Sequence, residues 1–339
     1  MTDPVRLALV GAGYWGKNLL RNFWSLPGAD VRLACDLNAE IRARAERSHA
    51  GLQTSARFED ILEDDEVEAV VIATETPQHF VMADAALRAG KHVFVEKPLA
   101  QTVQQAERLV EEAEQRGLCL MVGHLLRYHP AFEFVEQMIA DGELGDVHYL
   151  YSTRVNLGIV RERETAFESL APHDLAVSLA LIGSQPVSVS ASGAAYLRPG
   201  IQDVVFATVS FADGRLAHLH TSWLDPHKVR KVTVVGSRKM AVIDDMEPSE
   251  KVRIYDKGVE LTPEIGYPAY PEAMTLRSGD VVIPRLAPVE PLRAECEHFL
   301  HCVRSGNAPR TGGHEGLAVV RLLEAASRSL AQGGTAVPV

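Results

Sequence analysis

Residues 5–36 of the chain, VRLALVGAGYWGKNLLRNFWSLPGADVRLACD, decide its fold. Val5–Val10 is a short apolar run, Gly16–Ser25 has a helical pattern, and Val31–Asp36 is a second apolar run that ends in an acid. The first strand and the helix are joined by Gly11-Ala12-Gly13-Tyr14-Trp15-Gly16, and Asp36 lies twenty residues after Gly16. A G-x-G-x-x-G turn between strand and helix, with an acid at this spacing, predicts a dinucleotide-binding unit.

The three glycines of the turn have separate tasks in such a unit. Gly11 permits the tight turn, Gly13 lets backbone N–H groups approach a pyrophosphate, and Gly16 allows the helix to pack closely on the sheet. The pyrophosphate then lies at the positive N-terminus of the helix. We therefore expect these glycines, together with Tyr14 and Trp15, to bind the cofactor.

Asp36 stands where an acid selects between the two nicotinamide cofactors. Its carboxylate would accept hydrogen bonds from the adenosine ribose hydroxyls and would repel a 2′-phosphate, which predicts NAD rather than NADP. Arg42 and Arg44 follow, but both sit inside the next predicted helix and weaken this prediction only slightly.

The rest of the first 125 residues continues to alternate between strands and helices. Helices are expected over 39–49, 79–89 and 103–116, and strands over 69–73, 92–95 and 119–122. Such alternation implies right-handed crossovers and a parallel sheet. Residues 1–123 are therefore predicted to form an α/β Rossmann domain, a doubly wound parallel sheet.

Thr74-Glu75-Thr76-Pro77 follows the strand over 69–73, at the edge where open α/β sheets bind ligands. We expect Thr74, Thr76 and His79 to contact the cofactor. The alternative is an ordinary strand-to-helix turn with a proline near the start of the helix.

Glu96-Lys97-Pro98 follows the strand over 92–95 in the same way. A lysine at this edge can be desolvated, which lowers its pKa and suits it to proton transfer or to polarising a carbonyl. Pro98 fixes the backbone and keeps Lys97 out of helical geometry. Taken alone, however, Glu-Lys-Pro is more often a surface turn than a catalytic one.

After residue 145 the pattern changes to successive strands with short links. They are expected over 147–155, 187–193, 204–211, 216–223, 230–235, 240–244 and 252–256. Strands without intervening helices suggest a mostly antiparallel sheet in an α+β domain. Residues 261–288 are typical of a long irregular loop, and helices are expected over 291–305 and 313–330. The predicted second domain is 124–339, with the option that the two last helices pack back on the Rossmann domain.

Ala171-Pro172-His173-Asp174 is expected to open the helix that continues through Leu175–Leu181. A histidine at the start of a buried helix is well placed as a general base near neutral pH. For an isolated histidine, a capping or packed side chain is the more common alternative.

Composition excludes several classes of protein. A net charge of −11 argues against a nucleic-acid partner, whose binding depends largely on neutralising phosphates. No apolar run approaches the roughly 20 residues of a membrane span, and Met1-Thr2-Asp3-Pro4 lacks the basic start of a signal peptide. The cysteines, at 35, 119, 296 and 302, are scattered. They favour a reducing cytoplasm over disulfides or a structural zinc site.

Glu295, His298 and His301 recur every three residues, so one helix face could offer three metal ligands, as in a metal-dependent hydrolase. The spacing is not H-E-x-x-H, and no ligand from another segment suggests itself. We interpret the three as a polar helix face and expect no metal.

These motifs together resemble the glucose-fructose oxidoreductase, inositol dehydrogenase and MocA (Gfo/Idh/MocA) family over nearly the whole chain. The further matches are Thr-x-Thr-Pro-x-His (74–79), Glu-Lys-Pro-Leu (96–99), Gly-His (123–124), Pro-His-Asp (172–174) and Glu-x-x-His-Phe (295–299). The resemblance implies an open-faced antiparallel sheet in the second domain and homodimers or homotetramers joined through it. It also implies that Lys97 and His173 serve catalysis, and that Glu96, Lys97 and His124 contact the cofactor.

One departure narrows the substrate. Many polyol-oxidising members carry Asp four residues before the catalytic histidine, where this chain has Ser169. Residues 151–158, Arg161 and residues 169–174 resemble instead the nucleotide-sugar branch, which includes UDP-N-acetylglucosamine and UDP-N-acetylglucosaminuronate 3-dehydrogenases. The resemblance implies a nucleotide-sugar substrate bound by Lys97, Arg154, Asn156, Arg161, His173 and Asp174.

Arg154 and Arg161 fit this substrate physically. Two guanidinium groups on one strand and the following loop could hold a diphosphate or a carboxylate bidentately. The alternative is surface salt bridging with Glu162, Glu164 or Glu168.

The predicted reaction is hydride transfer from a sugar C–H to NAD. His173 would remove the hydroxyl proton, and Lys97 would stabilise the developing alkoxide. Two alternatives stay open: an NAD-dependent glycosidase that oxidises its substrate transiently, and a non-catalytic dinucleotide-binding regulator. A regulator would be expected to lose the lysine or the histidine, and this chain keeps both.

Overall fold

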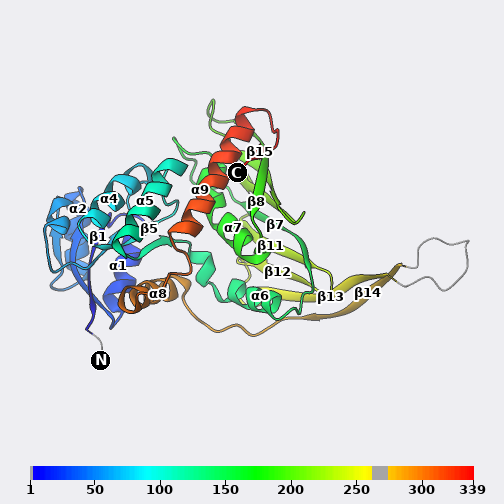
Figure 1. The fold of residues 1–339 in the computed structure, drawn as a ribbon, viewed down its shortest axis with the longest axis horizontal. Coiled ribbons are helices and arrows are strands. Elements are labelled where there is room, and N and C mark those ends of the chain that lie inside the picture. Colours follow the sequence, from blue (N-terminus) through cyan, green and yellow to red (C-terminus); the bar gives the residue numbers. More distant parts are fainter. Residues whose placement is uncertain (1–2, 262–273) are drawn as a thin grey trace, which may run out of the picture. The chain divides into compact units, whose positions relative to one another are not determined.

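Six parallel strands form one sheet in the computed structural model, which describes residues 3–261 and 274–339 (Figure 1). The strands are β1 (Val5–Val10), β2 (Ala29–Cys35), β3 (Gln53–Ser55), β4 (Ala69–Ile72), β5 (His92–Glu96) and β6 (Leu120–Gly123). Their order is β3-β2-β1-β4-β5-β6, so the chain reverses direction across the sheet between β1 and β4. Ligands of open α/β sheets bind at this switch point, beyond the carboxyl ends of the strands. The predicted parallel sheet is confirmed, and β3 is an addition to it.

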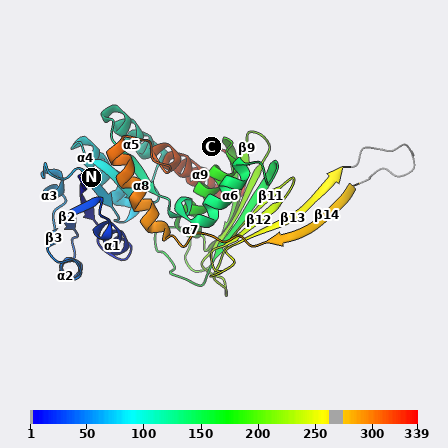
Figure 2. The same cartoon turned by 90° about the horizontal axis from the view of Figure 1, so that it is seen from below.

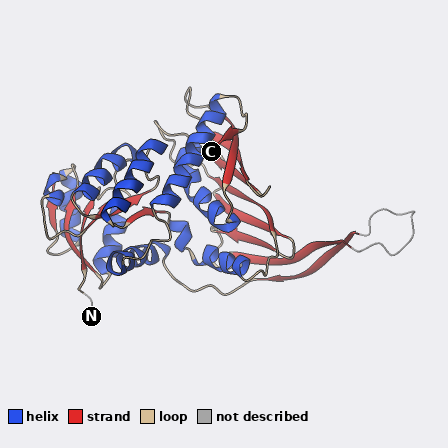
Figure 3. Ribbon diagram, viewed as in Figure 1, coloured by secondary structure: helices blue, strands red, loops and turns tan. Residues whose placement is uncertain are grey.

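Helices cover both faces of this sheet (Figure 3). They are α1 (Gly16–Ser25), α2 (Ala39–Ser48), α3 (Glu59–Leu62), α4 (Thr76–Arg88), α5 (Val103–Arg116), the 3-10 helix η1 (Leu125–Tyr128), α8 (Pro291–Ser305) and the first part of α9 (Gly313–Ala331). Phe23 of α1, Phe94 of β5 and Phe299 of α8 meet edge to face, with ring centroids 5.6–6.3 Å apart. The central strands β1, β4, β5 and β6 are buried on both sides, so their residues are mostly apolar without alternation, whereas the edge strand β3 is polar and partly exposed.

The second sheet has nine strands and is mostly antiparallel (Figure 2). Its order is β14 (Met274–Val282), β13 (Val252–Leu261), β12 (Met240–Asp244), β11 (Val229–Gly236), β7 (Val147–Val155), β10 (Leu216–Ser222), β9 (Val204–Phe211), β8 (Pro186–Ala194) and β15 (Val337–Pro338). Within this sheet, β7 and β10 are the only neighbouring strands that pair in parallel in the described part of the chain. The α+β architecture expected from the sequence is confirmed.

One face of the second sheet is covered and the other is open. Helix α7 (Ala166–Ile182) packs on β7, β9 and β10, and α6 (Pro130–Ala140) packs on α7 and β12. Alternation along the strands follows from this: Leu150 of β7 and Leu219 of β10 are buried, whereas Tyr149 and Tyr151 are 43% and 42% exposed.

The prediction of an irregular loop over 261–288 is wrong for residues 274–282, which form β14, whereas residues 283–288 have no regular secondary structure, as expected. Strand β13 runs on to Leu261, and β14 pairs with it from Ile254↔Val282 to Leu261↔Met274. Its long-range pairing explains why local pattern did not reveal it, since β14 finds its hydrogen bonds only on β13. Residues 262–273 of that predicted loop lie outside the described residues.

The chain forms two compact units, residues 1–129 with 289–324, and residues 130–288 with 325–339. The first unit extends to residue 129, past the expected boundary after residue 123. It also takes in α8 and the start of α9, which is the packing that the sequence analysis gave as an option. Over the described part of the chain, no helix combines the length and the apolar composition needed to cross a membrane.

Candidate active site

The Gly-rich turn joins β1 to α1 at the carboxyl edge of the six-stranded sheet. Gly11 has φ +86°, and a Cβ there would lie 2.7 Å from the carbonyl oxygen of Ala73. A Cβ at Gly16 would lie 1.8 Å from the carbonyl oxygen of Gly11, whereas the atom nearest to one at Gly13 would be Ile41 Cδ1 at 3.9 Å. The turn is closely packed where the backbone folds back and open at Gly13. This is the shape that backbone binding of a pyrophosphate needs.

Asp36 follows β2 and is half-buried, with its Oδ1 accepting the backbone N–H of Asn38 at 2.9 Å. Arg42 donates to the carbonyl oxygen of Asp36 at 2.7 Å, and Arg44 donates to that of Ala12 at 3.3 Å. Both arginines of α2 thus donate to backbone carbonyl oxygens around the turn. The arrangement fits an acid that receives ribose hydroxyls.

The turn after β4 differs from the prediction in one respect. Helix α4 begins at Thr76, three residues earlier than expected, with Pro77 in its first turn. His79 is 1% exposed, and its ring nitrogens lie 2.8 Å from the carbonyl oxygen of Pro98 and 3.1 Å from that of Thr74. The ring thus lies between the segments that follow β4 and β5, and its contact with a cofactor stays a prediction. Thr74 and Thr76 remain half-buried at the sheet edge.

Glu96 ends β5, and Lys97 follows it with a cis peptide bond to Pro98. The Glu96 side chain is buried and accepts hydrogen bonds from the indole of Trp15 and from the backbone N–H of Lys97 at 3.3 Å. Burial raises the pKa of Glu96 to about 7, although the Trp15 hydrogen bond and the nearby Lys97 charge act in the opposite direction. Lys97 itself is half-buried.

His124 follows β6 at the same edge and is 1% exposed. Neither ring nitrogen has a hydrogen-bond partner among the described residues. Burial, and then the charges of Lys97 and Arg127, lower its pKa to about 3. A neutral imidazole with unused donor and acceptor capacity beside the Lys97 charge fits the predicted cofactor contact, because buried polar groups are normally satisfied.

Glu295 of α8 is a buried acid whose role the sequence did not suggest. It is 1% exposed, and its Oε1 has no hydrogen-bond partner in the described part of the chain. Burial, followed by the charge of Glu96, raises its pKa well above the usual range. His298 accepts the backbone N–H of Arg310 at 2.9 Å, and His301 is exposed. The described residues contain no group of three or more His, Cys, Asp or Glu side chains that could hold a metal.

His173 lies inside α7 and not at its start, which corrects the sequence prediction. Thr165 caps this helix and forms a capping box with Glu168, so the helix begins at Ala166 and runs through Pro172. A capping box fixes a helix start by satisfying two backbone donors. It also occupies Glu168, which was one predicted partner of the arginines. His173 is half-buried one residue before Asp174, which is 2% exposed.

Arg154 of β7 is paired with Asp174, which neither predicted alternative foresaw. Its Nε and Nη2 donate to the two carboxylate oxygens at 2.5 and 3.1 Å, and the Arg154 residue is 7% exposed. Burial acts to lower the pKa of Arg154, but the charge and hydrogen bonds of Asp174 raise it overall. The guanidinium is thus paired with a protein carboxylate, and its contact with a substrate stays a prediction.

Arg161 is exposed in the segment between β7 and α7. Glu162, one of the glutamates that could have formed a salt bridge with it, pairs instead with Arg198 at 3.5 Å. Asn156 is half-buried at the start of this segment, and its Nδ2 would lie 2.0 Å from a Cβ at Gly158. Of the two arginines, Arg161 is thus the exposed one, and its contact with an anionic ligand stays a prediction.

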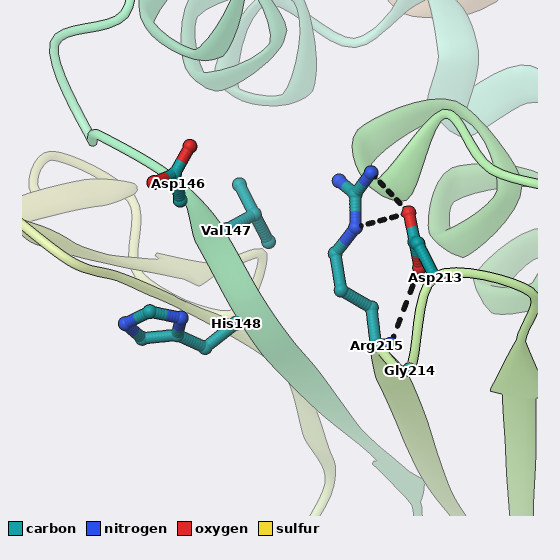
Figure 4. A pocket seen from close by; sticks show the side chains of 6 residues that line it. All are labelled: Asp146, Val147, His148, Asp213, Gly214 and Arg215. Atoms are coloured by element: carbon teal, nitrogen blue, oxygen red, sulfur yellow. Dashed lines mark hydrogen bonds and ion pairs between the residues drawn. The ribbon is translucent and has the colours of Figure 1, made fainter.

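A pocket in the second unit is lined by none of these residues (Figure 4). It is lined by Asp146, Val147, His148, Asp213, Gly214 and Arg215. Arg215 is bound by the Asp213 carboxylate at 2.7 Å and by the carbonyl oxygen of Ile182 at 2.7 Å. Since its cation is already satisfied, we do not assign the candidate site here.

The Gly-rich turn, Asp36, Lys97 and His124 meet at one edge of a parallel sheet and define an NAD-binding Rossmann domain. A family model described as "Oxidoreductase family, NAD-binding Rossmann fold" matches residues 5–124, and the GFO/IDH/MocA C-terminal domain matches residues 132–242. Together they cover more than half of the chain, which therefore belongs to the Gfo/Idh/MocA family of oxidoreductases.

Relatives within the family differ in substrate. The chain is 28% identical over 332 residues to UDP-N-acetylglucosamine 3-dehydrogenase of Acidithiobacillus ferrooxidans, covering 95% of each chain. It is 28% identical over 341 residues to inositol 2-dehydrogenase of Rhizobium meliloti, covering 97% of each. A solved structure of the Acidithiobacillus enzyme superposes with a TM-score of 0.82 at 25% identity, over 98% of this chain and 99% of that one. The chain is an NAD-binding dehydrogenase, and the relatives leave its substrate open.

Proposed function

We propose that the protein oxidises a sugar hydroxyl to a ketone with NAD, most specifically at carbon 3 of a UDP-N-acetylhexosamine or its uronate. The observation that carries the proposal is Lys97 at the carboxyl edge of β5, flanked by buried Glu96 and by His124 with two unsatisfied ring nitrogens. A similar dehydrogenase acts on UDP-N-acetylglucosamine by its name.

The cofactor would be held by residues of the first unit. Gly11, Gly13 and Gly16 shape the phosphate turn, and Asp36 would bind the adenosine ribose in preference to a 2′-phosphate. The remaining proposed contacts are Tyr14, Trp15, Thr74, Thr76, His79, Glu96, Lys97 and His124. When bound, NAD supplies the hydride acceptor, and the protein supplies orientation and proton transfer.

Two side chains would move or hold the proton. We assign His173 as the base that removes the hydroxyl proton and Lys97 as the cation that stabilises the oxygen as negative charge develops. Arg161 and Asn156 would contact the substrate, with Arg161 pairing with its diphosphate or carboxylate. Arg154 and Asp174, which bind each other, would orient His173.

The partner we propose is a second copy of this chain, in a dimer or tetramer joined through the open face of the nine-stranded sheet. Tyr151 of β7 is level with His218 of β10, and Phe206 of β9 stacks on His220 with ring centroids 4.3 Å apart. Exposed aromatic side chains are typical of interface cores. All four cysteines are buried and free, which supports a reducing cytoplasm as the location.

A screen of UDP-sugars and free polyols for NAD reduction tests the proposal. We expect NADH formation with a UDP-N-acetylhexosamine or its uronate when no acceptor is added. A parallel reaction with 2-oxoglutarate tests whether this acid takes the hydride from NADH and regenerates NAD. Oxidation of inositol alone would move the chain to the polyol branch. Release of a free sugar from an aryl glycoside would favour the glycosidase, and no turnover with any sugar would favour the regulator.

A further inference from the structure

The carboxylate of Glu96 is held from two directions by donors that belong to different parts of the candidate site. Its Oε1 accepts the indole N–H of Trp15, and its Oε2 accepts the backbone N–H of Lys97 at 3.3 Å. Trp15 is part of the Gly-rich turn and is the N-cap residue of α1. Glu96 therefore connects the phosphate-binding turn directly to the peptide that carries Lys97.

The neighbouring strand leaves this carboxylate a fitted space. Gly123 of β6 is paired with Glu96 of β5. A Cβ at Gly123 would lie 3.0 Å from each carboxyl atom of Glu96, which is tighter than ordinary van der Waals contact. With only 9% of the residue exposed, the carboxylate occupies the place that a side chain at 123 would take.

We propose that Glu96 is a positioning residue: its carboxylate holds the Gly-rich turn and the Lys97 peptide in one arrangement, so that NAD bound at the turn meets Lys97 in a fixed place. The inference deepens the proposed NAD-dependent function and rests on it. It differs from a direct cofactor contact because Glu96 acts through Trp15 and through the backbone of Lys97.

The link depends on Glu96 being ionised. A protonated carboxyl keeps one good acceptor oxygen, so one of the two donors loses its partner. The groups that face Glu96 are Lys97 on its own strand end and Glu295 and Cys296 on α8. Since burial raises the Glu96 pKa to about 7, proton uptake near neutral pH weakens the link. NAD affinity is then lost as the pH falls through this value.

A double-mutant cycle on NAD binding tests the link, with dissociation constants measured by calorimetry in the absence of sugar. At pH 8, Trp15→Phe and Glu96→Gln should each raise the Kd about tenfold, since a hydrogen bond to a charged group is removed. The double variant should be no weaker than either single variant. Trp24→Phe, on the same helix but packed on His49, is the matched control and should keep the wild-type Kd.

The pH dependence of the Kd for NAD supplies a second readout, which would not change if Glu96 had only a structural role. Between pH 8 and pH 6 the wild-type and Trp24→Phe proteins should lose about tenfold in affinity, whereas Glu96→Gln should show one weak Kd throughout. Additive losses of about a hundredfold in the double variant, or wild-type Kd values in both single variants, would overturn the inference. No turnover with any sugar would refute the proposed function and leave this cycle unaffected.

Discussion

Each proposed catalytic residue stands beside a buried carboxylate, and the two carboxylates are held in opposite ways. Glu96 precedes Lys97 in the first unit and receives an uncharged indole and a backbone N–H. Asp174 follows His173 in the second unit and receives a buried guanidinium from Arg154. Burial raises the pKa of Glu96 to about 7 against the effect of its donors, whereas the Asp174 carboxylate raises the pKa of the buried Arg154 guanidinium. The residue beside His173 is thus one half of a buried ion pair, and the residue beside Lys97 is a carboxylate that titrates near neutral pH.

The largest loss of activity should come from replacing Lys97 or His173, the residues next to these two carboxylates. Lys97→Ala and His173→Ala should each lower kcat by about 10²–10⁴, the usual range for a general acid–base group. The double variant should lose little more than the worse single variant, because the two act as one proton-transfer unit. Near-normal turnover of His173→Ala would remove the proposed base and with it the reason for the Arg154–Asp174 pair.

Breaking the ion pair should affect stability more than any other change near the site. Arg154→Ala leaves Asp174 buried without a partner, which should cost about 3–5 kcal/mol in the free energy of unfolding, measured with urea. Arg198→Ala breaks an exposed pair with Glu162 and should cost less than about 1 kcal/mol. Equal losses in the two variants would contradict a buried pair.

Titration of Glu96 should make the free energy of unfolding depend on pH. The Glu96 pKa is raised from 4.5 to about 7 in the folded protein, so the folded state binds more protons than the unfolded state between these values. Stability should therefore fall as the pH rises through this window, by on the order of 1–3 kcal/mol from this group. Glu96→Gln should remove that slope in urea titrations at pH 5, 6 and 7. An unchanged slope would mean that Glu96 is ionised throughout.

A smaller effect on substrate binding is expected from Arg161, which is exposed. Arg161→Ala should raise the KM for a UDP-sugar about tenfold and leave the Kd for NAD unchanged, because an exposed charge contact is worth roughly 1.4 kcal/mol. A wild-type KM would make Arg161 an ordinary surface residue and would leave the anionic substrate without an anchor.

Local patterns predicted the first unit well because its signals are short-range. The Gly11-x-Gly13-x-x-Gly16 turn and the spacing to Asp36 each depend on residues within one βαβ unit, and the structure shows the packing that they require. What local pattern missed depends on distant partners. Strand β14 exists only by pairing with β13.

The site residues show the same limit. Arg154 had three nearby glutamates as candidate partners, yet the fold brings it Asp174 from the next helix. The His79 ring lies against two backbone carbonyl oxygens, of Thr74 and Pro98. Glu295 of α8 lies close enough to Glu96 for the charge of Glu96 to raise its pKa. Neither set of neighbours follows from the local sequence pattern. The sequence could single out candidate site residues, but it could not show which of them form hydrogen bonds or ion pairs with other parts of the protein.

Hydride transfer from the sugar itself is tested most directly with UDP-N-acetylglucosamine and its uronate that carry deuterium at carbon 3. The protein is incubated with NAD and each labelled substrate, and the NADH formed is analysed by mass spectrometry. The account predicts NADH that carries the deuterium with at least one of the two, together with a 3-keto sugar. NADH without deuterium, or no NADH from either substrate, would contradict it.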